Sequence, residues 1–188
     1  MNTDRLPPLP PSTWTEAQRE QAQAIIDGPR GALVSPFIPL MRSPELMGHA
    51  QRMGEYLRYR SNLPLRLSEL AILITARHWS QQVEWAIHAP IAQKAGVAAS
   101  TVQAIAQGRK PPDLHDDEAA VHAFCIELHQ QRGISDATWS RALNLFGEQG
   151  VVDLIGINGY YTLLSMVMNA SCTPAPPSSV APLPSLSL

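Results

Sequence analysis

The residues with the clearest chemical potential are a glutamate and a histidine four positions apart, Glu84 and His88. If this segment is helical, the two side chains lie on one face and can meet. A carboxylate beside an imidazole orients the ring and raises its basicity, so His88 becomes a candidate proton carrier near neutral pH. The competing interpretation is an ordinary surface pair, which is common on helices.

The surroundings of the pair favour partial burial. The residues between and beside the two are apolar, namely Trp85, Ala86, Ile87 and Ala89. Buried titratable groups have shifted pKa values and are concentrated at functional sites. We therefore expect a proton-transfer site here rather than a surface contact.

The pair belongs to a longer spaced set of residues: Glu69-Leu70-Ala71-Ile72-Leu73, then Ala76-Arg77, then Glu84-Trp85-x-x-His88, Ala92 and Gly96. This set resembles the core repeat of the carboxymuconolactone decarboxylase family, over about residues 64–107. The resemblance implies an all-α, alkylhydroperoxidase D-like bundle. It also implies that His88, Glu84 and Glu69 form the catalytic set.

The peroxidase branch of that superfamily carries Cys-x-x-Cys-x-x-x-His on the same helix. Aligned on His88, the two thiol positions are occupied by Gln81 and Glu84, and the cysteines of this chain are Cys125 and Cys172. A disulfide-cycling peroxidase requires an attacking thiolate and a resolving thiol. The resemblance is therefore to the branch that lacks the redox pair.

The decarboxylase branch implies a cofactor-free lyase that acts on a small carboxylated lactone or related acid from aromatic catabolism. Loss of the carboxylate leaves an enolate, so the site must stabilise negative charge and deliver a proton to carbon. His88 would donate that proton, while Glu84 and Glu69 would set its charge and orientation. The alternatives are a non-catalytic oligomeric helical protein that binds a small ligand, and a peroxidase-related antioxidant protein.

Five further residues are candidates for substrate binding. Arg77 could pair bidentately with a substrate carboxylate, although a helix-end salt bridge is the alternative. Tyr160 and Tyr161 could donate hydrogen bonds to an enolate, with core packing as the alternative. Gln81 and Asn158 complete the set.

Histidines also recur every seven residues, at His115, His122 and His129. Seven residues return to nearly the same helix face, which makes a metal stripe conceivable. The outer two are too far apart to bind a single ion, so we interpret the stripe as a solvated face and expect no metal.

Helical spacing of apolar residues runs through most of the chain, between two proline-rich ends. We expect an extended tail over residues 1–11, one helical domain over 12–170 and a disordered tail over 171–188. Residues 31–41 should form a loop, because Pro36 and Pro39 interrupt them. The expected helices number about eight: Ser12 or Thr13 to Gly28, 44–62, 64–79, 82–95, 99–108, 116–133, one capped by Ser135 and an apolar one ending near Met168.

Composition narrows the partners and the location. With 188 residues and a net charge of −2, the chain fits one domain and has no broad positive field for nucleic acid. The N-terminus lacks a secretory apolar stretch and the cysteines are not paired in sequence, so we expect a cytoplasmic protein.

The apolar run 151–168 contains Asp153 and Asn158, which favours a buried helix over a membrane span. That helix has no obvious solvent face, so we expect a homo-oligomer, whether dimer, trimer or hexamer.

Overall fold

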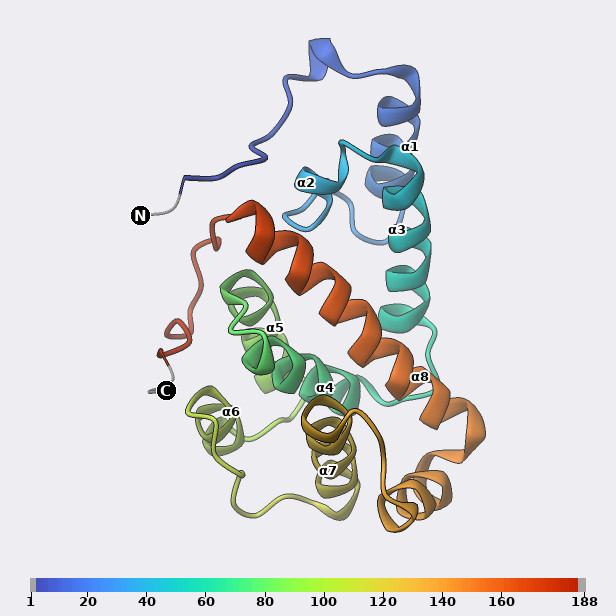
Figure 1. Cartoon of the computed structure of the whole chain (residues 1–188), viewed down its shortest axis with the longest axis vertical. Helices are drawn as coiled ribbons and strands as arrows, with labels where there is room; N and C mark the ends of the chain where they lie inside the picture. Colours follow the sequence, from blue (N-terminus) through green and yellow to red (C-terminus); the bar gives the residue numbers. More distant parts are fainter. Residues whose placement is uncertain (1–2, 186–188) are drawn as a thin grey trace.

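The computed structural model describes residues 3–185 and is helical throughout, with no strand in that part of the chain (Figure 1). It contains eight α-helices, which confirms the predicted all-α bundle of about eight helices. A short 3-10 turn, Pro11–Thr13, precedes them. The helices are α1 (Glu16–Asp27), α2 (Phe37–Leu40), α3 (Pro44–Tyr59), α4 (Leu65–His78), α5 (Gln82–Lys94), α6 (Ala99–Ala106), α7 (Asp116–Gln131) and α8 (Asp136–Ser171).

The N-terminal part differs from the prediction in two places. Helix α1 begins after Thr15 rather than after Ser12 or Thr13, because Thr15 and Gln18 form a reciprocal capping box. The segment expected to be a loop contains the single helical turn α2. This turn exists because it places the fully buried ring of Phe37 in the core, and the burial outweighs the local effect of the prolines.

Helix α8 crosses the middle of the molecule (Figure 1). The two helices that we expected here are both present. They are joined end to end across a kink at Gly147, where the backbone is non-helical, with φ +67° and ψ 176°, and where glycine carries no steric penalty. By length and composition alone α8 could cross a membrane. Of its most apolar 18-residue window, 56% is buried inside the fold.

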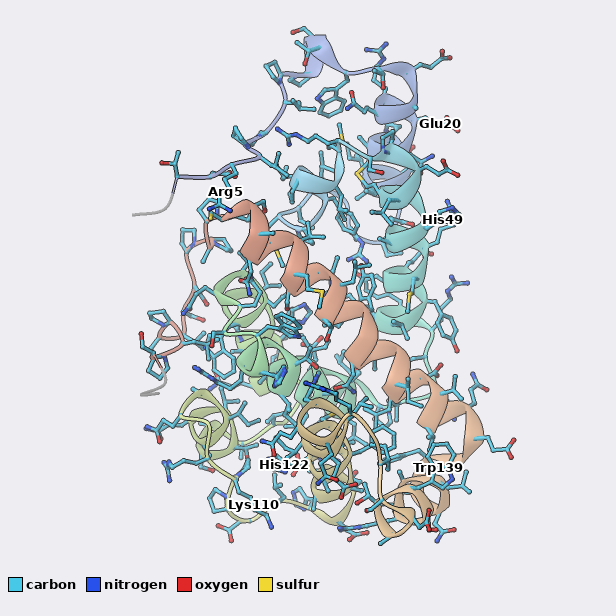
Figure 2. All side chains as sticks on the ribbon, viewed as in Figure 1. Arg5, Glu20, His49, Lys110, His122 and Trp139 are labelled. Atoms are coloured by element: carbon cyan, nitrogen blue, oxygen red, sulfur yellow. The ribbon has the colours of Figure 1, made fainter. Side chains whose placement is uncertain are left out.

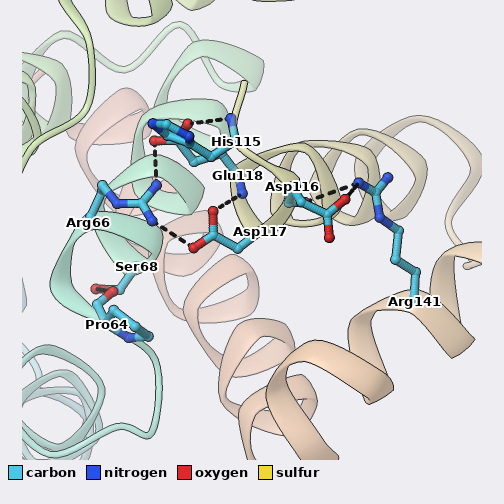
Figure 3. Close-up of polar contacts among 8 residues, drawn as sticks. All are labelled: Pro64, Arg66, Ser68, His115, Asp116, Asp117, Glu118 and Arg141. Carbon is cyan, nitrogen blue, oxygen red and sulfur yellow. Dashed lines mark hydrogen bonds and ion pairs between the residues drawn. The ribbon is translucent and has the colours of Figure 1, made fainter. Parts of the chain in front are cut away.

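Helix α4 forms the centre of the bundle and packs against α5, α7 and α8. Every residue from Leu67 to Arg77 is buried, so this helix is covered on all sides. Its first turn is tied to α7, since Arg66 forms ion pairs with Asp117 at 2.6 Å and Glu118 at 2.5 Å (Figure 3). The anchored turn lies immediately before Glu69, which is therefore held on a rigid element.

The described part of the C-terminal segment lies where we expected a disordered tail. Residues 174–185 have no helix or strand, and Ser178, Ala181 and Leu183 contact α5. Pro90 inside α5 cannot donate to the carbonyl of Ala86, and the Ser178 hydroxyl donates to that carbonyl instead, at 2.7 Å. Trp85 donates to the carbonyl of Ala181 and the Leu183 side chain is buried. These contacts place the segment beside α5.

Candidate functional site

Three buried side chains meet between α4 and α5: Glu69, Glu84 and His88. His88 Nδ1 lies 2.7 Å from Glu69 Oε2, and His88 Nε2 lies 3.3 Å from Glu84 Oε2. All three residues are at most 2% exposed. The imidazole is thus held between two carboxylates, and the predicted catalytic residues form one connected set, which we call the relay.

The local sequence explains how the relay is assembled. Glu84 and His88 are one helical turn apart on α5 and share a face. Glu69 reaches them across a tight connection between α4 and α5, in which Ser80 has a positive φ of 49°. The Gln81 side chain then caps α5 by accepting a hydrogen bond from the Val83 N–H. The short connection forces the two helices together.

The two carboxylates make His88 an unusually weak acid. Burial disfavours the charged ring and lowers its pKa, but the negative charges and hydrogen bonds of Glu69 and Glu84 outweigh this effect. The pKa of His88 rises to about 9. His88 is therefore protonated at neutral pH, and both ring nitrogens are donors.

A cavity of about 190 Å³ lies beside the relay. Its polar wall comes from four separate parts of the chain: the segment after α1, then α3, α5 and α8. Apolar side chains, among them Val34, Ile87 and Leu164, form the remainder. The polar residues that line it are Arg30, Arg58, Glu84, His88, Tyr160 and Tyr161.

Several polar atoms around this cavity are buried without a hydrogen-bond partner among the described residues. They are Nε and Nη2 of Arg30, Oε1 of Glu84 and the Tyr160 hydroxyl. A buried polar atom without a partner is unfavourable by roughly 1–3 kcal/mol. A ligand that accepts from Arg30 and Tyr160 and donates to Glu84 would satisfy them. The site is thus built for a polar guest.

Both tyrosines remain neutral hydrogen-bond donors. Burial raises the pKa of Tyr160 to about 12 and holds the pKa of Tyr161 well above its ordinary value. The Tyr161 ring meets the His88 ring edge-on, with centroids 5.1 Å apart. Tyr160 fits because residue 54 is glycine: a Cβ at Gly54 would collide with the Tyr160 hydroxyl and lie 2.7 Å from Arg30 Nη2.

Three of the predicted substrate-binding residues lie away from this cavity. Arg77 donates to the carbonyls of Ala106 and Pro184, at 3.2 and 2.8 Å, and among the described residues it forms neither the alternative helix-end salt bridge nor an ion pair with the relay. Gln81 caps α5 and donates to Asn169. Asn158 accepts from Thr75 and donates to the carbonyl of Leu154 in the core. Gln81 and Asn158 have structural roles because their polar atoms are used within the protein, whereas the Nε of Arg77 has no hydrogen-bond partner among the described residues.

Arg30 and Arg58 are the site residues that the sequence did not reveal. Arg30 lies in the irregular segment after α1, and its guanidinium is 4.9 Å from the centre of the Phe37 ring. Burial opposes the charge on Arg58, but Tyr161, Tyr59 and the relay glutamates keep its pKa above the ordinary value. No sequence motif links either arginine to Glu84. The local sequence signal that could have indicated the site is Gly54, because its missing side chain makes room for Tyr160 and Arg30.

The remaining candidate groups do not form a metal centre or a thiol site. No group of three or more His, Cys, Asp or Glu side chains could hold a metal ion within residues 3–185. His115, at one end of the histidine stripe, is the N-cap residue of α7. Cys125 is buried, accepts a hydrogen bond from Asn158 and has its pKa raised by burial to about 12.

Comparison with models of known families and with curated proteins finds no match for this chain. The chemistry of the site is therefore interpreted from its own geometry.

Proposed function

We propose that this protein is a cofactor-free, decarboxylase-like lyase that acts on a small carboxylated lactone or related acid from aromatic catabolism. The observation that carries the proposal is the buried Glu69–His88–Glu84 relay, which opens on a cavity lined by two arginines and two tyrosines. The resemblance of residues 64–107 to the carboxymuconolactone decarboxylase family points to the same chemistry.

The cavity supports a small anionic substrate. Its volume of about 190 Å³ holds roughly six water molecules at about 30 Å³ each, which suits a compact one-ring acid. Arg30 presents two unpartnered buried nitrogens, and guanidinium groups bind carboxylates with charge-assisted hydrogen bonds. Arg58 adds a second positive charge. The polar guest described above would thus carry a carboxylate that accepts from Arg30, and another group of the guest would donate to Glu84.

The residues suggest a division of labour during the reaction. Arg30 and Arg58 would hold a carboxylate that stays on the product, because strong pairing to the departing one would stabilise the reactant. When the other carboxylate leaves as CO₂, the electron pair of the broken C–C bond moves into the conjugated carbonyl. Neutral Tyr160 can donate to the resulting enolate oxygen. His88 then transfers the Nε2 proton to carbon and regains a proton from water.

Glu69 and Glu84 act on the proton that His88 carries. Glu69 binds Nδ1 and keeps the ring oriented, so that Nε2 is the nitrogen on the side of Glu84. Glu84 belongs both to the relay and to the cavity wall, and its free Oε1 can pass the proton between His88 and the substrate. The buried carboxylates thus keep a proton available at a pH where a free imidazole is mostly neutral.

A peroxidase function has little support. A thiolate nucleophile requires a lowered pKa, whereas burial raises the pKa of Cys125 to about 12. Neither Cys125 nor Cys172 lines the cavity beside the relay. Both cysteines are free, which agrees with the cytoplasmic location that we propose for this protein.

The second candidate is a non-catalytic, oligomeric protein that binds a small acid in the same cavity. The observation in its favour is an exposed apolar stripe on α8, where Val152, Ile155 and Met166 are 62%, 40% and 47% exposed. Their spacing places them along one side of the helix. We propose that this stripe packs against further copies of the chain in a homo-oligomer, and this assembly is compatible with either function.

Turnover in deuterated water separates the two candidates. A panel of carboxylated lactones and related one-ring acids is incubated with the protein, and CO₂ release and deuterium in the product are followed. We expect wild type to release CO₂ and to place one deuterium on the carbon that carried the departing carboxylate. We expect His88→Ala and Glu84→Gln to turn over more slowly than wild type by about 100-fold or more. His49→Ala is the matched control, because His49 is exposed on α3 (Figure 2).

Two outcomes decide against catalysis by the relay. If acids bind to wild type but are recovered unchanged, the cavity is a binding site only. If His88→Ala turns over and incorporates deuterium like wild type, His88 is not the proton donor.

A further inference from the structure

A second cavity lies between α4, α6 and α7, and it shares no lining residue with the cavity beside the relay. Its volume is about 410 Å³, roughly twice that of the first. Figure 2 labels two of its lining residues, Lys110 and His122, in the lower part of the molecule. The proposed reaction makes no use of this cavity.

The wall of the second cavity is positively charged. Arg77, Arg109 and Lys110 line it, no aspartate or glutamate does, and none of the three forms an ion pair among the described residues. Arg77 is only 5% exposed, and its Nε has no hydrogen-bond partner in that part of the chain. Its other two nitrogens donate to backbone carbonyls and to Ser80, all of them uncharged. The buried positive charge of Arg77 is thus uncompensated.

The rest of the wall suits a flat apolar body. Ile74, Ile105 and Ile126 contribute aliphatic surface. The imidazoles of His78 and His129 are stacked, with ring centroids 4.5 Å apart and planes inclined by 16°. Burial lowers the pKa of His78, and burial together with His78 lowers the pKa of His129 to about 4, so these rings are neutral aromatic surface at pH 7.

We propose that this second cavity is a binding site for an aromatic carboxylate of about two rings. Its cations would bind the carboxylate, and its isoleucines and stacked imidazoles would contact the rings. Inorganic phosphate has no apolar body to cover the isoleucines, so an organic acid fits this wall better. The site stands apart from the relay and does not depend on the function proposed for it.

Titration of the full-length protein with 2-naphthoate, followed by calorimetry and by the fluorescence of the ligand, tests this site. We expect saturable binding with one ligand per chain. The double variant Arg109→Gln/Lys110→Gln should bind about tenfold more weakly, because it removes two charge-assisted contacts. Both side chains are exposed, so the fold should be retained. The charge-matched control is Arg52→Gln/Lys94→Gln, two exposed cations that line neither cavity, and its affinity should be unchanged.

Two further measurements show which cavity the ligand occupies and whether its carboxylate is the group that the protein recognises. The uncharged 2-naphthamide should bind far more weakly than naphthoate, and Arg58→Gln, in the cavity of the relay, should leave naphthoate binding unchanged. The proposal is overturned if naphthoate does not bind, if the amide binds equally well, or if affinity depends on Arg58 and not on Arg109 and Lys110. None of these results bears on turnover at His88, so the two proposals fail separately.

Discussion

Replacing Glu69 with glutamine is the sharpest perturbation of the relay, because it removes a charge while keeping the size of the side chain. Glu69 Oε2 lies 2.7 Å from His88 Nδ1. At an effective dielectric constant of about 20, two unit charges at that separation attract by about 6 kcal/mol. Burial of the imidazolium opposes this attraction and remains in the variant.

The net effect in the wild-type protein is smaller than the Coulomb attraction. The pKa of His88 rises from 6.5 to about 9, which corresponds to on the order of 3 kcal/mol in favour of the protonated ring. Without Glu69, only Glu84 at 3.3 Å opposes the burial. We therefore expect Glu69→Gln to lower the pKa of His88 by at least about two units, to near or below 6.5.

The assay is an NMR titration of the His88 Cε1–H signal across a pH range that spans 6.5 and 9. The chain has six histidines, and the signal lost in His88→Ala identifies the relevant one. Glu20→Gln, an exposed position on α1 (Figure 2), is the matched control and should leave the titration unchanged. If His88 titrates identically in wild type and Glu69→Gln, or if the pKa of His88 in wild type is below 7, the Glu69 carboxylate does not raise the pKa of His88.

Three other outcomes follow from the same geometry. Gly54→Ala should destabilise the protein by about 1–3 kcal/mol, since the methyl group collides with the Tyr160 hydroxyl, and thermal unfolding measures this. The pKa of His88 is raised on folding, so the relay contributes its full stabilisation below pH 6.5 and loses it as the pH rises through about 9. Denaturant unfolding at pH 6 and above pH 9 measures whether the free energy of unfolding falls over this range. Cys125 should resist a thiol reagent at pH 8 in the native protein, while the partly exposed Cys172 reacts, and mass spectrometry distinguishes them.

Much of the fold followed from local patterns. The apolar spacing predicted α3 to α7 to within a few residues, because each begins or ends at a proline, a glycine or a polar cap. The one-turn helix α2 was missed, whereas the two helices expected on either side of Gly147 are present with a kink between them. Helix α2 depends on the core that Phe37 enters, and a local propensity contains no information about that core.

The C-terminal segment shows the same limit. Over residues 173–185 it has neither helix nor strand, as its prolines predicted. They could not show that Pro90 leaves the Ala86 carbonyl free for Ser178, because this pairing joins residues about 90 positions apart. A contact that long-range is set by the packing of α5 and not by the composition of the tail.

The pairing of Glu84 with His88 was determined by the sequence itself, since a spacing of four on a helix forces the two side chains onto one face. The tertiary structure decided everything that acts on that pair. It buried the pair, brought Glu69 against Nδ1, and surrounded the cavity with Arg30, Arg58 and the tyrosines in place of Arg77. The physical reason is that helical periodicity fixes neighbours within one helix, whereas a cavity forms where separate elements pack, and the partners there are chosen by the whole core.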